Sequence, residues 1–144
     1  MAAINHALEN IAVDQATTDV RVELDAGVRV KGDGILIGHV LQNLIGNAIK
    51  FRRPSAKAVI TIAARNRADD KIEVAVTDNG IGIEPQFADK VFEMFCRLHN
   101  DDEFDGAGIG LAICRKIVDD HDGEIWVDKS YADGARIVFT LPAA

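Results

Sequence analysis

The sequence feature that most constrains this fold is an amphipathic run that begins at Asp33 and ends with the segment NLIGNAIKF, residues 43–51. A helix turns about every 3.6 residues, so Asn43 and Asn47 share one face and Lys50 lies about one turn further on. Apolar residues on the neighbouring flank can cover a core, and they are Leu36, Val40, Leu44, Ile45, Ala48 and Ile49. Two amides and an ammonium beside that flank form a polar stripe, which is either a solvated helix face or part of a binding site.

Helix and strand patterns alternate along the rest of the chain. Apolar residues at helical spacing predict three helices, over 4–13, 33–51 and 109–121. Alternating and β-branched runs predict strands over 20–24, 28–30, 58–64, 71–77, 124–128 and 136–141. The polar segment 66–70 indicates a hairpin, and a turn around Asp133 and Gly134 joins the last two strands. This order predicts a two-layer α/β sandwich with a mixed sheet, and 144 residues fit one domain, 1–144.

The charge balance excludes some classes of partner. The formal net charge is -7, whereas nucleic acids and anionic membranes bind basic surfaces, so we expect neither as a direct partner. No run of about 18 apolar residues and no basic-then-apolar start occurs, which predicts no transmembrane helix and no signal peptide. Cys96 and Cys114 lack metal-ligand spacing, so we expect free thiols in a cytoplasmic protein.

A glycine-containing segment, Asp78 to Ile83, directly follows a predicted strand. Gly80 and Gly82 would let the backbone approach a flat ligand closely, and the Asp78 carboxylate could then accept a hydrogen bond from an exocyclic amine. Adenine offers that amine, whereas guanine offers a carbonyl at the same position. A charge-assisted bond of this kind contributes roughly 1.5–3 kcal/mol. The alternative is that the segment forms only a tight turn.

A second glycine-containing segment, Gly106 to Leu111, opens the last predicted helix. Free N–H groups and the helix dipole favour an anion at such a helix start. The segment is not a dinucleotide fingerprint, because no strand leads directly into it and its glycine spacing differs. It is not a Walker loop, because no Lys-Ser or Lys-Thr pair follows the last glycine. Alone it is a weak signal.

Together and in this order, the three segments resemble the ATP-binding catalytic domain of sensor histidine kinases. That domain belongs to the GHKL or Bergerat family, which includes gyrase-type, chaperone-type and mismatch-repair ATPases. The resemblance covers nearly the whole chain. Residues 43–51 look like the N box, 78–83 like the first glycine box, 91–95 like the F box and 106–111 like the second glycine box. The run 97–127 looks most like kinases of the phytochrome-associated type.

The resemblance implies a fold and a ligand. Helices would cover one face of a mixed, mostly antiparallel sheet, and Mg²⁺-ATP would lie between the helical layer and a mobile lid. Asn47 would bind Mg²⁺ through its side-chain oxygen, and Asn43 would support it directly or through water. Asp78 would recognise the adenine amine. The implied nucleotide-binding set is Asn47, Lys50, Phe51, Asp78, Gly80, Gly82, Ile83, Gly106, Gly108, Gly110 and Leu111.

The implied catalytic set is Asn43, Asn47, Lys50 and Arg97. Lys50 would neutralise phosphate charge and Arg97 would reach the terminal phosphate, although Arg97 could instead be a solvated lid residue. Phe92 and Phe95 would anchor the lid by packing. Gyrase-like and chaperone-like ATPases carry a water-activating Glu at the position of Asn43, and an amide cannot act as a general base. We therefore expect very slow hydrolysis and transfer of the γ-phosphate to an external histidine.

The acceptor histidine is not recognisable in this chain. The resemblance implies a motif like His-Glu/Asp-x-Arg-Thr-Pro, and no histidine here has those neighbours; the four are His6, His39, His99 and His121. His39 would either face the pocket or pack in the core, and His121 sits where the family has a helix-terminal histidine. We expect an excised domain without its hairpin, or an orphan acting in trans. Its partners would be a histidine-bearing dimerisation domain and, indirectly, a response regulator, with this chain as a monomer.

Three residues depart from the family pattern. Ala107 and Ala135 stand where hydroxyl residues are common, and Asp122 replaces the first Gly of a Gly-Gly pair. Each lost hydroxyl could cost about 1 kcal/mol if it were bonded to nucleotide or its water. Activity in isolation would then be weak or absent. Two alternatives therefore stay open: a nucleotide-binding pseudokinase module that regulates a partner, and a stand-alone serine kinase of the anti-sigma-factor type.

Overall fold

The computed structural model describes residues 18–24, 34–50, 57–83, 92, 110–131 and 133–143. Two helices and five strands lie in these ranges: β1 (Thr18–Leu24), α2 (Gly34–Lys50), β2 (Ala58–Asn66), β3 (Lys71–Asp78), α3 (Gly110–Asp120), β4 (Ile125–Val127) and β5 (Arg136–Pro142). Each matches a predicted element to within a few residues. The predicted helix over 4–13 and the predicted strand over 28–30 lie outside the described ranges. No helix within those ranges is long and apolar enough to cross a bilayer.

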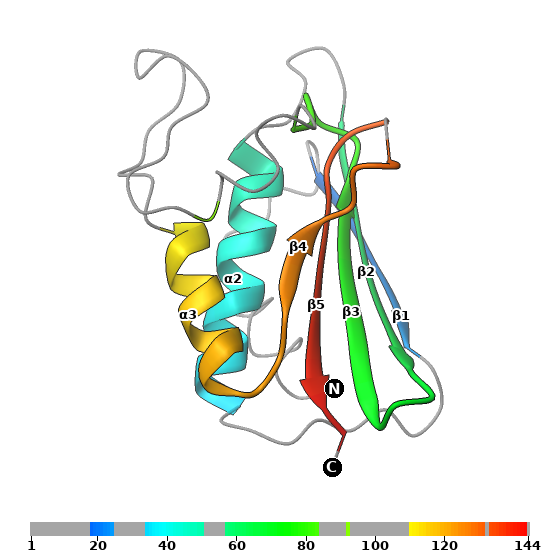
Figure 1. Ribbon diagram of the computed structural model, residues 1–144. Helices are drawn as coiled ribbons and strands as arrows, with labels where there is room; N and C mark the ends of the chain where they lie inside the picture. The colour runs from blue at the N-terminus through cyan, green and yellow to red at the C-terminus, as the bar shows by residue number, and fades with distance from the viewer. Residues whose placement is uncertain are drawn as a thin grey trace.

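The strands form one mixed sheet in the order β1-β2-β3-β5-β4. β1 pairs with β2 in parallel, and the other three pairs are antiparallel. The predicted hairpin joins β2 to β3 through a turn closed by a bond from Arg67 N to Lys71 O at 2.8 Å. Figure 1 shows both α2 and α3 on one face of this sheet. The predicted fold class, a two-layer sandwich with a mostly antiparallel mixed sheet, is confirmed.

The core lies between the sheet and the two helices. Alternate residues of β2 and β3 are buried, as the period of a half-buried strand requires, whereas β5 is buried at five consecutive residues, 137–141. The buried residues of α2 are Ile37, Val40, Leu41, Leu44, Ile45 and Ala48. The prediction that Leu36 joins this stripe is wrong, because its side chain is 39% exposed. Leu36 lies seven residues before Asn43, which places it on the amide face of the helix, and Ile37 and Leu41 occupy the core instead.

The connection from α3 to β4 is built around a left-handed residue. Asp122 has a φ of 59°, and the Lys71 ammonium donates to its carbonyl oxygen at 2.7 Å. His121 Nδ1 donates to the Ile117 carbonyl at 2.8 Å, so the predicted helix-terminal histidine caps α3. The next residue is glycine because a Cβ on Gly123 would overlap the backbone oxygen of Thr140.

We predict that Asp122→Gly stabilises the protein. A left-handed conformation costs a residue with a side chain about 1 kcal/mol, and glycine avoids that cost. The Lys71 bond is made to the backbone and survives the change. Urea unfolding should give a free energy of unfolding higher by about 1 kcal/mol. Asp119→Gly is the matched control, because Asp119 is an exposed helical residue of α3 and the change there should destabilise. A loss of stability in Asp122→Gly would contradict this explanation.

Candidate functional site

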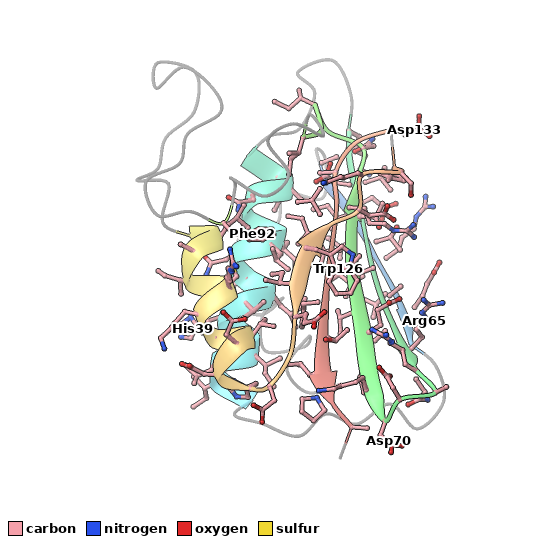
Figure 2. The ribbon with its side chains drawn as sticks, in the orientation of Figure 1. His39, Arg65, Asp70, Phe92, Trp126 and Asp133 are labelled. Carbon is pink, nitrogen blue, oxygen red and sulfur yellow. The ribbon has the colours of Figure 1, made fainter. Side chains whose placement is uncertain are left out.

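The described parts of three segments singled out in the sequence, residues 43–50, 78–83 and 110–111, lie toward one end of the molecule. Figure 1 shows the carboxyl ends of β3 and α2 at that end, and the amino end of α3 beside α2 is the end of α3 that points toward it. The turn between β4 and β5 lies at the same end, as the Asp133 label in Figure 2 shows, whereas Asp70 and the β2–β3 hairpin lie at the opposite end. The residues that carry the predicted chemistry at the ends of these three elements are Asp78, Asn47 and Gly110.

Asp78 is held so that one of its two carboxylate oxygens is saturated. Its Oδ1 accepts from Gly80 N at 2.8 Å and from Ala135 N at 3.1 Å. Its own backbone N donates to Ala135 O at 2.9 Å. None of the residues that the structure describes donates to Oδ2. The carboxylate is half-buried and its position is set by backbone, so Oδ2 is available as a fixed acceptor.

Burial sets the charge behaviour of this carboxylate. Desolvation raises the pKa of Asp78 above its ordinary value of 3.8, and the bonds from the Gly80 and Ala135 N–H groups oppose that rise. A carboxylate kept partly out of water, with no cationic partner among the residues that the structure describes, is costly in the ligand-free protein. Such an arrangement is typical of binding sites.

Two glycines form the wall beside Asp78. Gly82 has a φ of 80°, and a Cβ there would lie 3.0 Å from Gly134 O. Gly134 has a φ of 156°, and a Cβ there would overlap the Asp78 carbonyl oxygen and lie 2.9 Å from the Asn79 Cα. Sequence reasoning identified Gly82 but treated Gly134 only as part of a turn. The sequence signal that could have identified Gly134 is the departure from the family pattern at the adjacent residue, Ala135. The fold places Ala135 against Asp78.

Asn79 is a structural residue that the sequence reasoning missed. Its Oδ1 accepts from Val59 N at 2.8 Å, and its Nδ2 donates to Lys57 O at 3.0 Å. Asp78 pairs with Ile60 in the sheet, so Asn79 comes at the next register position and its side chain continues the ladder. This clamp holds the loop after β3 against the start of β2 and thereby fixes the direction of Asp78.

The amide face of α2 is present as predicted. Asn43 and Asn47 are both half-buried and lie one turn apart. No described residue hydrogen-bonds the Asn47 amide. Cys114 on α3 contacts the same helix, because its Sγ donates to the carbonyl oxygen of Val40 at 3.7 Å. Lys50 is the last residue of α2, and its side chain lies outside the described residues. His39 is exposed, so it has no packing role in the core (Figure 2).

The remaining predicted residues divide into core residues and residues outside the described ranges. Ile83 and Leu111 are partly buried against the hydrophobic core, and Gly80 is buried. Gly110 is the first residue of α3. Phe92 is buried in the core, which confirms its packing role. Outside the described residues lie Phe51, Phe95, Cys96, Arg97, Gly106, Ala107 and Gly108.

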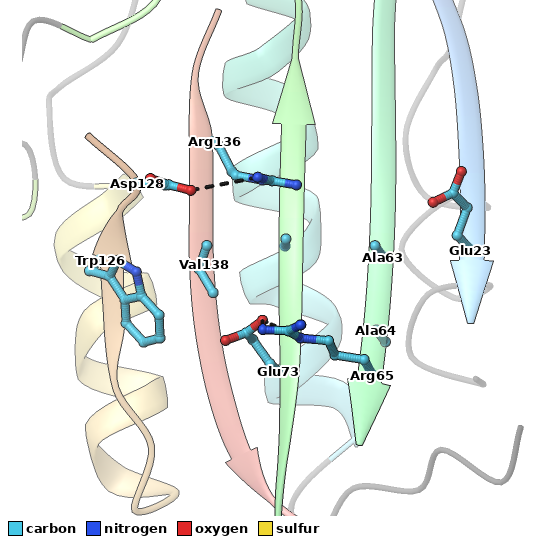
Figure 3. Close-up of a pocket in the computed structure, with 10 residues that line it drawn as sticks. Glu23, Ala63, Ala64, Arg65, Glu73, Trp126, Asp128, Arg136 and Val138 are labelled. Carbon is cyan, nitrogen blue, oxygen red and sulfur yellow. Dashed lines mark hydrogen bonds and ion pairs between the residues drawn. The ribbon is translucent and has the colours of Figure 1, made fainter. Parts of the chain in front are cut away.

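A groove of about 480 Å³ lies on the other face of the sheet, away from the helices (Figure 3). One cross-strand row forms its floor and ends: Glu23, Ala63, Ala75, Val138 and Trp126. Its charged walls are internally paired, Arg65 with Glu73 at 2.6 Å and Arg136 with Asp128 at 3.6 Å. None of the predicted site residues lines this groove, so it is separate from the candidate site.

A family model described as "Histidine kinase-, DNA gyrase B-, and HSP90-like ATPase" matches residues 32–144. This chain belongs to that family. The matched range contains all four boxes, including the parts outside the described residues. The family match agrees with the fold, because the order of helices and strands along the chain brings the ends of β3 and α2 and the start of α3 toward one end of the molecule.

Individual members of the family show how much of a longer protein this chain represents. Over 140 residues, this chain is 44% identical to cyanobacterial phytochrome A of Nostoc sp.. The aligned region covers 97% of this chain but only 18% of that protein. The mycobacterial sensor histidine kinase MprB superposes with a TM-score of 0.86 at 28% identity, covering 99% of this chain and 93% of the solved chain. The catalytic domain of histidine kinase ThkA superposes with a TM-score of 0.81 at 30% identity, covering 98% of this chain and 92% of the solved chain. This chain therefore corresponds to a histidine kinase catalytic domain.

Proposed function

We propose that this chain binds Mg²⁺-ATP and donates the γ-phosphate to a histidine on a separate dimerisation and phosphoacceptor domain in two-component signalling. The observation that carries the proposal is the Asp78 carboxylate. Its Oδ1 accepts two backbone N–H groups, while no described residue donates to Oδ2. Family membership and the histidine kinase relatives support the reaction class.

The adenine end of the site fits a purine amine. Oδ2 of Asp78 would accept a hydrogen bond from the exocyclic amine of adenine, and it would repel the carbonyl oxygen of guanine. Gly82 and Gly134 leave no side chain beside the carboxylate, so a flat ring can approach the backbone closely. The site would therefore select ATP over GTP.

The phosphate end fits a divalent cation and an anion. Asn47 would offer its amide oxygen to Mg²⁺, which takes few protein ligands and keeps water and phosphate oxygens. When bound, the cation would neutralise charge on the phosphates. Lys50 would add a second positive charge, and the N–H groups at the start of α3 would face the phosphates. Arg97 and the glycines at 106 and 108 would complete this end.

The same residues argue against rapid hydrolysis. The position one turn before Asn47 carries Asn43, and an amide cannot remove a proton from water at neutral pH. Phosphoryl transfer depends mainly on positioning and charge neutralisation, so a site without a base can still donate phosphate to an external nucleophile. We propose that residues 1–144 act as one catalytic unit, with the acceptor histidine supplied by another domain.

One observation favours a second candidate, a pseudokinase module that binds nucleotide to set the shape of a partner surface. Ala135 bonds Asp78 through its backbone, and its methyl side chain offers no hydroxyl to nucleotide or its water. The loss of such a contact would weaken binding by a few-fold. This candidate predicts nucleotide binding without phosphoryl transfer.

The test of the proposed function is a phosphotransfer assay. This chain is mixed with a cognate histidine-bearing hairpin domain, Mg²⁺ and γ-labelled ATP, and the label on protein is followed through acid and alkali treatment. We expect acid-labile, alkali-stable label on histidine and a turnover number for free phosphate far below one per second. Acid-stable label on serine would support a serine kinase instead. Bound nucleotide without any label would support the pseudokinase module.

A further inference from the structure

Arg136 lies on the outer face of the sheet, on the opposite side of β3 from Asp78. Thr77 and Asp78 are successive residues at the end of β3, so their side chains leave the sheet on opposite faces. Arg136 stands opposite Thr77 in the register of β3 and β5, and it lines the outer-face groove. Its guanidinium lies across β3 in Figure 3. Any effect of Arg136 on a nucleotide at Asp78 must therefore pass through the protein.

The Arg136 side chain closes the turn between β4 and β5. Its Nη1 lies 3.6 Å from Oδ2 of Asp128, and its guanidinium carbon lies 5.6 Å from the centre of the Tyr131 ring. The Asp128 backbone N also donates to the Arg136 carbonyl oxygen at 2.8 Å. Asp128 is the first residue after β4, and Arg136 is the first residue of β5. One guanidinium at the end of the turn thus contacts its start and its middle.

The same guanidinium anchors this turn to β3. Arg136 Nε donates to Thr77 Oγ1 at 3.3 Å. Asp78 N bonds Ala135 O, so the adjacent pair of Thr77 and Arg136 is of the non-hydrogen-bonded kind, in which facing side chains lie closest. Ala135, directly before Arg136, also donates its N–H to Asp78 Oδ1. The contact on the outer face is therefore one residue away from the backbone bond that orients the carboxylate.

We propose that Arg136 is a positioning residue for adenine recognition, which holds the β4–β5 turn so that Ala135 N stays on Asp78 Oδ1 and Oδ2 faces the ligand. This inference rests on the proposed function for its effect on nucleotide binding. The contacts themselves belong to the ligand-free protein and do not depend on that function. Without them the turn would move away from β3, Oδ1 would lose one of its two donors, and the carboxylate could rotate.

A merely structural role for Arg136 makes a different prediction. If the side chain only stabilises the sheet, its removal would lower the free energy of unfolding and leave the folded site unchanged. If it positions the turn, its removal would raise the pKa of Asp78 further, because the bond from the Ala135 N–H group lowers that pKa. The pKa of Asp78 therefore separates the two roles.

The experiment compares four proteins: the parent chain, Arg136→Met, Thr77→Val and Arg65→Met. Thr77→Val removes the acceptor oxygen without changing any charge. Arg65→Met is the matched control, because Arg65 forms the other ion pair of the outer-face groove, with Glu73 at 2.6 Å, near the β2–β3 hairpin and away from the turn. The Asp78 carboxyl carbon is titrated by NMR without nucleotide. Dissociation constants for Mg²⁺-ATP and Mg²⁺-GTP are measured by calorimetry.

We expect both Arg136→Met and Thr77→Val to raise the pKa of Asp78 and to weaken Mg²⁺-ATP binding by roughly two- to fivefold, the range for one partly exposed polar contact. The preference for ATP over GTP should narrow in both variants. Arg65→Met should keep the parent's pKa and affinities.

An unchanged Asp78 pKa or ATP affinity in either variant, or equal changes in Arg65→Met, would overturn the inference. If the parent chain does not bind ATP, the proposed function fails, while the pKa of Asp78 still decides whether Arg136 holds the carboxylate.

Discussion

Replacing Asp78 by Asn is expected to weaken Mg²⁺-ATP binding by roughly 10- to 150-fold, which corresponds to the 1.5–3 kcal/mol of one charge-assisted hydrogen bond. The asparagine Oδ1 can still accept from Gly80 N and Ala135 N, so the turn keeps its two bonds. The change places an NH₂ group where Oδ2 was, and that donor faces the amine of adenine. Isothermal titration of both proteins with Mg²⁺-ATP measures the difference.

Base selectivity is the internal control for this substitution. The asparagine NH₂ can donate to the carbonyl oxygen of guanine, so the preference for ATP over GTP should narrow or reverse in Asp78→Asn. A protein that had merely unfolded locally would lose both nucleotides equally. Equal ATP affinity in the two proteins would remove the assignment of Asp78 as the adenine-binding residue.

The same substitution should stabilise the ligand-free protein at neutral pH. Because burial raises the pKa of Asp78 in the folded state above its unfolded value of 3.8, the folded protein holds this proton more tightly. This group therefore contributes stability below pH 3.8 that is lost as pH rises through the folded-state pKa. At neutral pH the carboxylate is ionised and partly desolvated, and the neutral amide avoids that cost. Higher stability with lower affinity is the expected signature of a binding residue.

The second large effect is expected from Gly134→Ala. A Cβ at this position would overlap the backbone oxygen of Asp78, and the φ of 156° is one that alanine rarely adopts. Overlap with backbone and a strained φ together should lower the free energy of unfolding by roughly 2–4 kcal/mol. The displaced turn would also pull Ala135 N away from Asp78 Oδ1, so ATP affinity should fall as well.

Gly46→Ala is the matched control for this glycine. Gly46 lies within α2, and a Cβ there would have no atom of the described neighbouring residues within 4 Å. Alanine is the better helix former, so this change should raise the free energy of unfolding by about 0.5–1 kcal/mol. Urea unfolding and ATP titration of both variants test the pair. A Gly134→Ala protein with parent-like stability and affinity would contradict the close packing of this turn against Asp78.

The sequence predicts the elements of this fold well because its periodic patterns are strong. The apolar spacing of α2 and the alternation in β2 and β3 identified those elements, and family resemblance identified their arrangement. Leu36 was misplaced because it lies four residues before Val40. That spacing fits the predicted apolar stripe, but it also fits the neighbouring amide face of the helix. The helix face that packs is set by tertiary contacts, and Ile37 and Leu41 make those contacts.

The parts of the site that sequence reasoning missed are contacts between distant segments. Ala135 N donates to Asp78 Oδ1 across 57 residues of sequence, and Cys114 Sγ reaches Val40 O across 74. Neither contact leaves a periodic pattern, because each depends on the order in which strands and helices pack. The sequence identifies which residues carry charge and polarity, and the fold determines which of their atoms are already bonded.

We propose that the ends of β3 and α2 hold opposite ends of one Mg²⁺-ATP molecule. A crystal structure of this chain with Mg²⁺ and a non-hydrolysable ATP analogue tests it most directly. We expect the adenine amine within about 3.2 Å of Asp78 Oδ2 and the cation about 2.1 Å from the Asn47 amide oxygen. An adenine ring bound away from Asp78, or a cation without contact to Asn47, would contradict it.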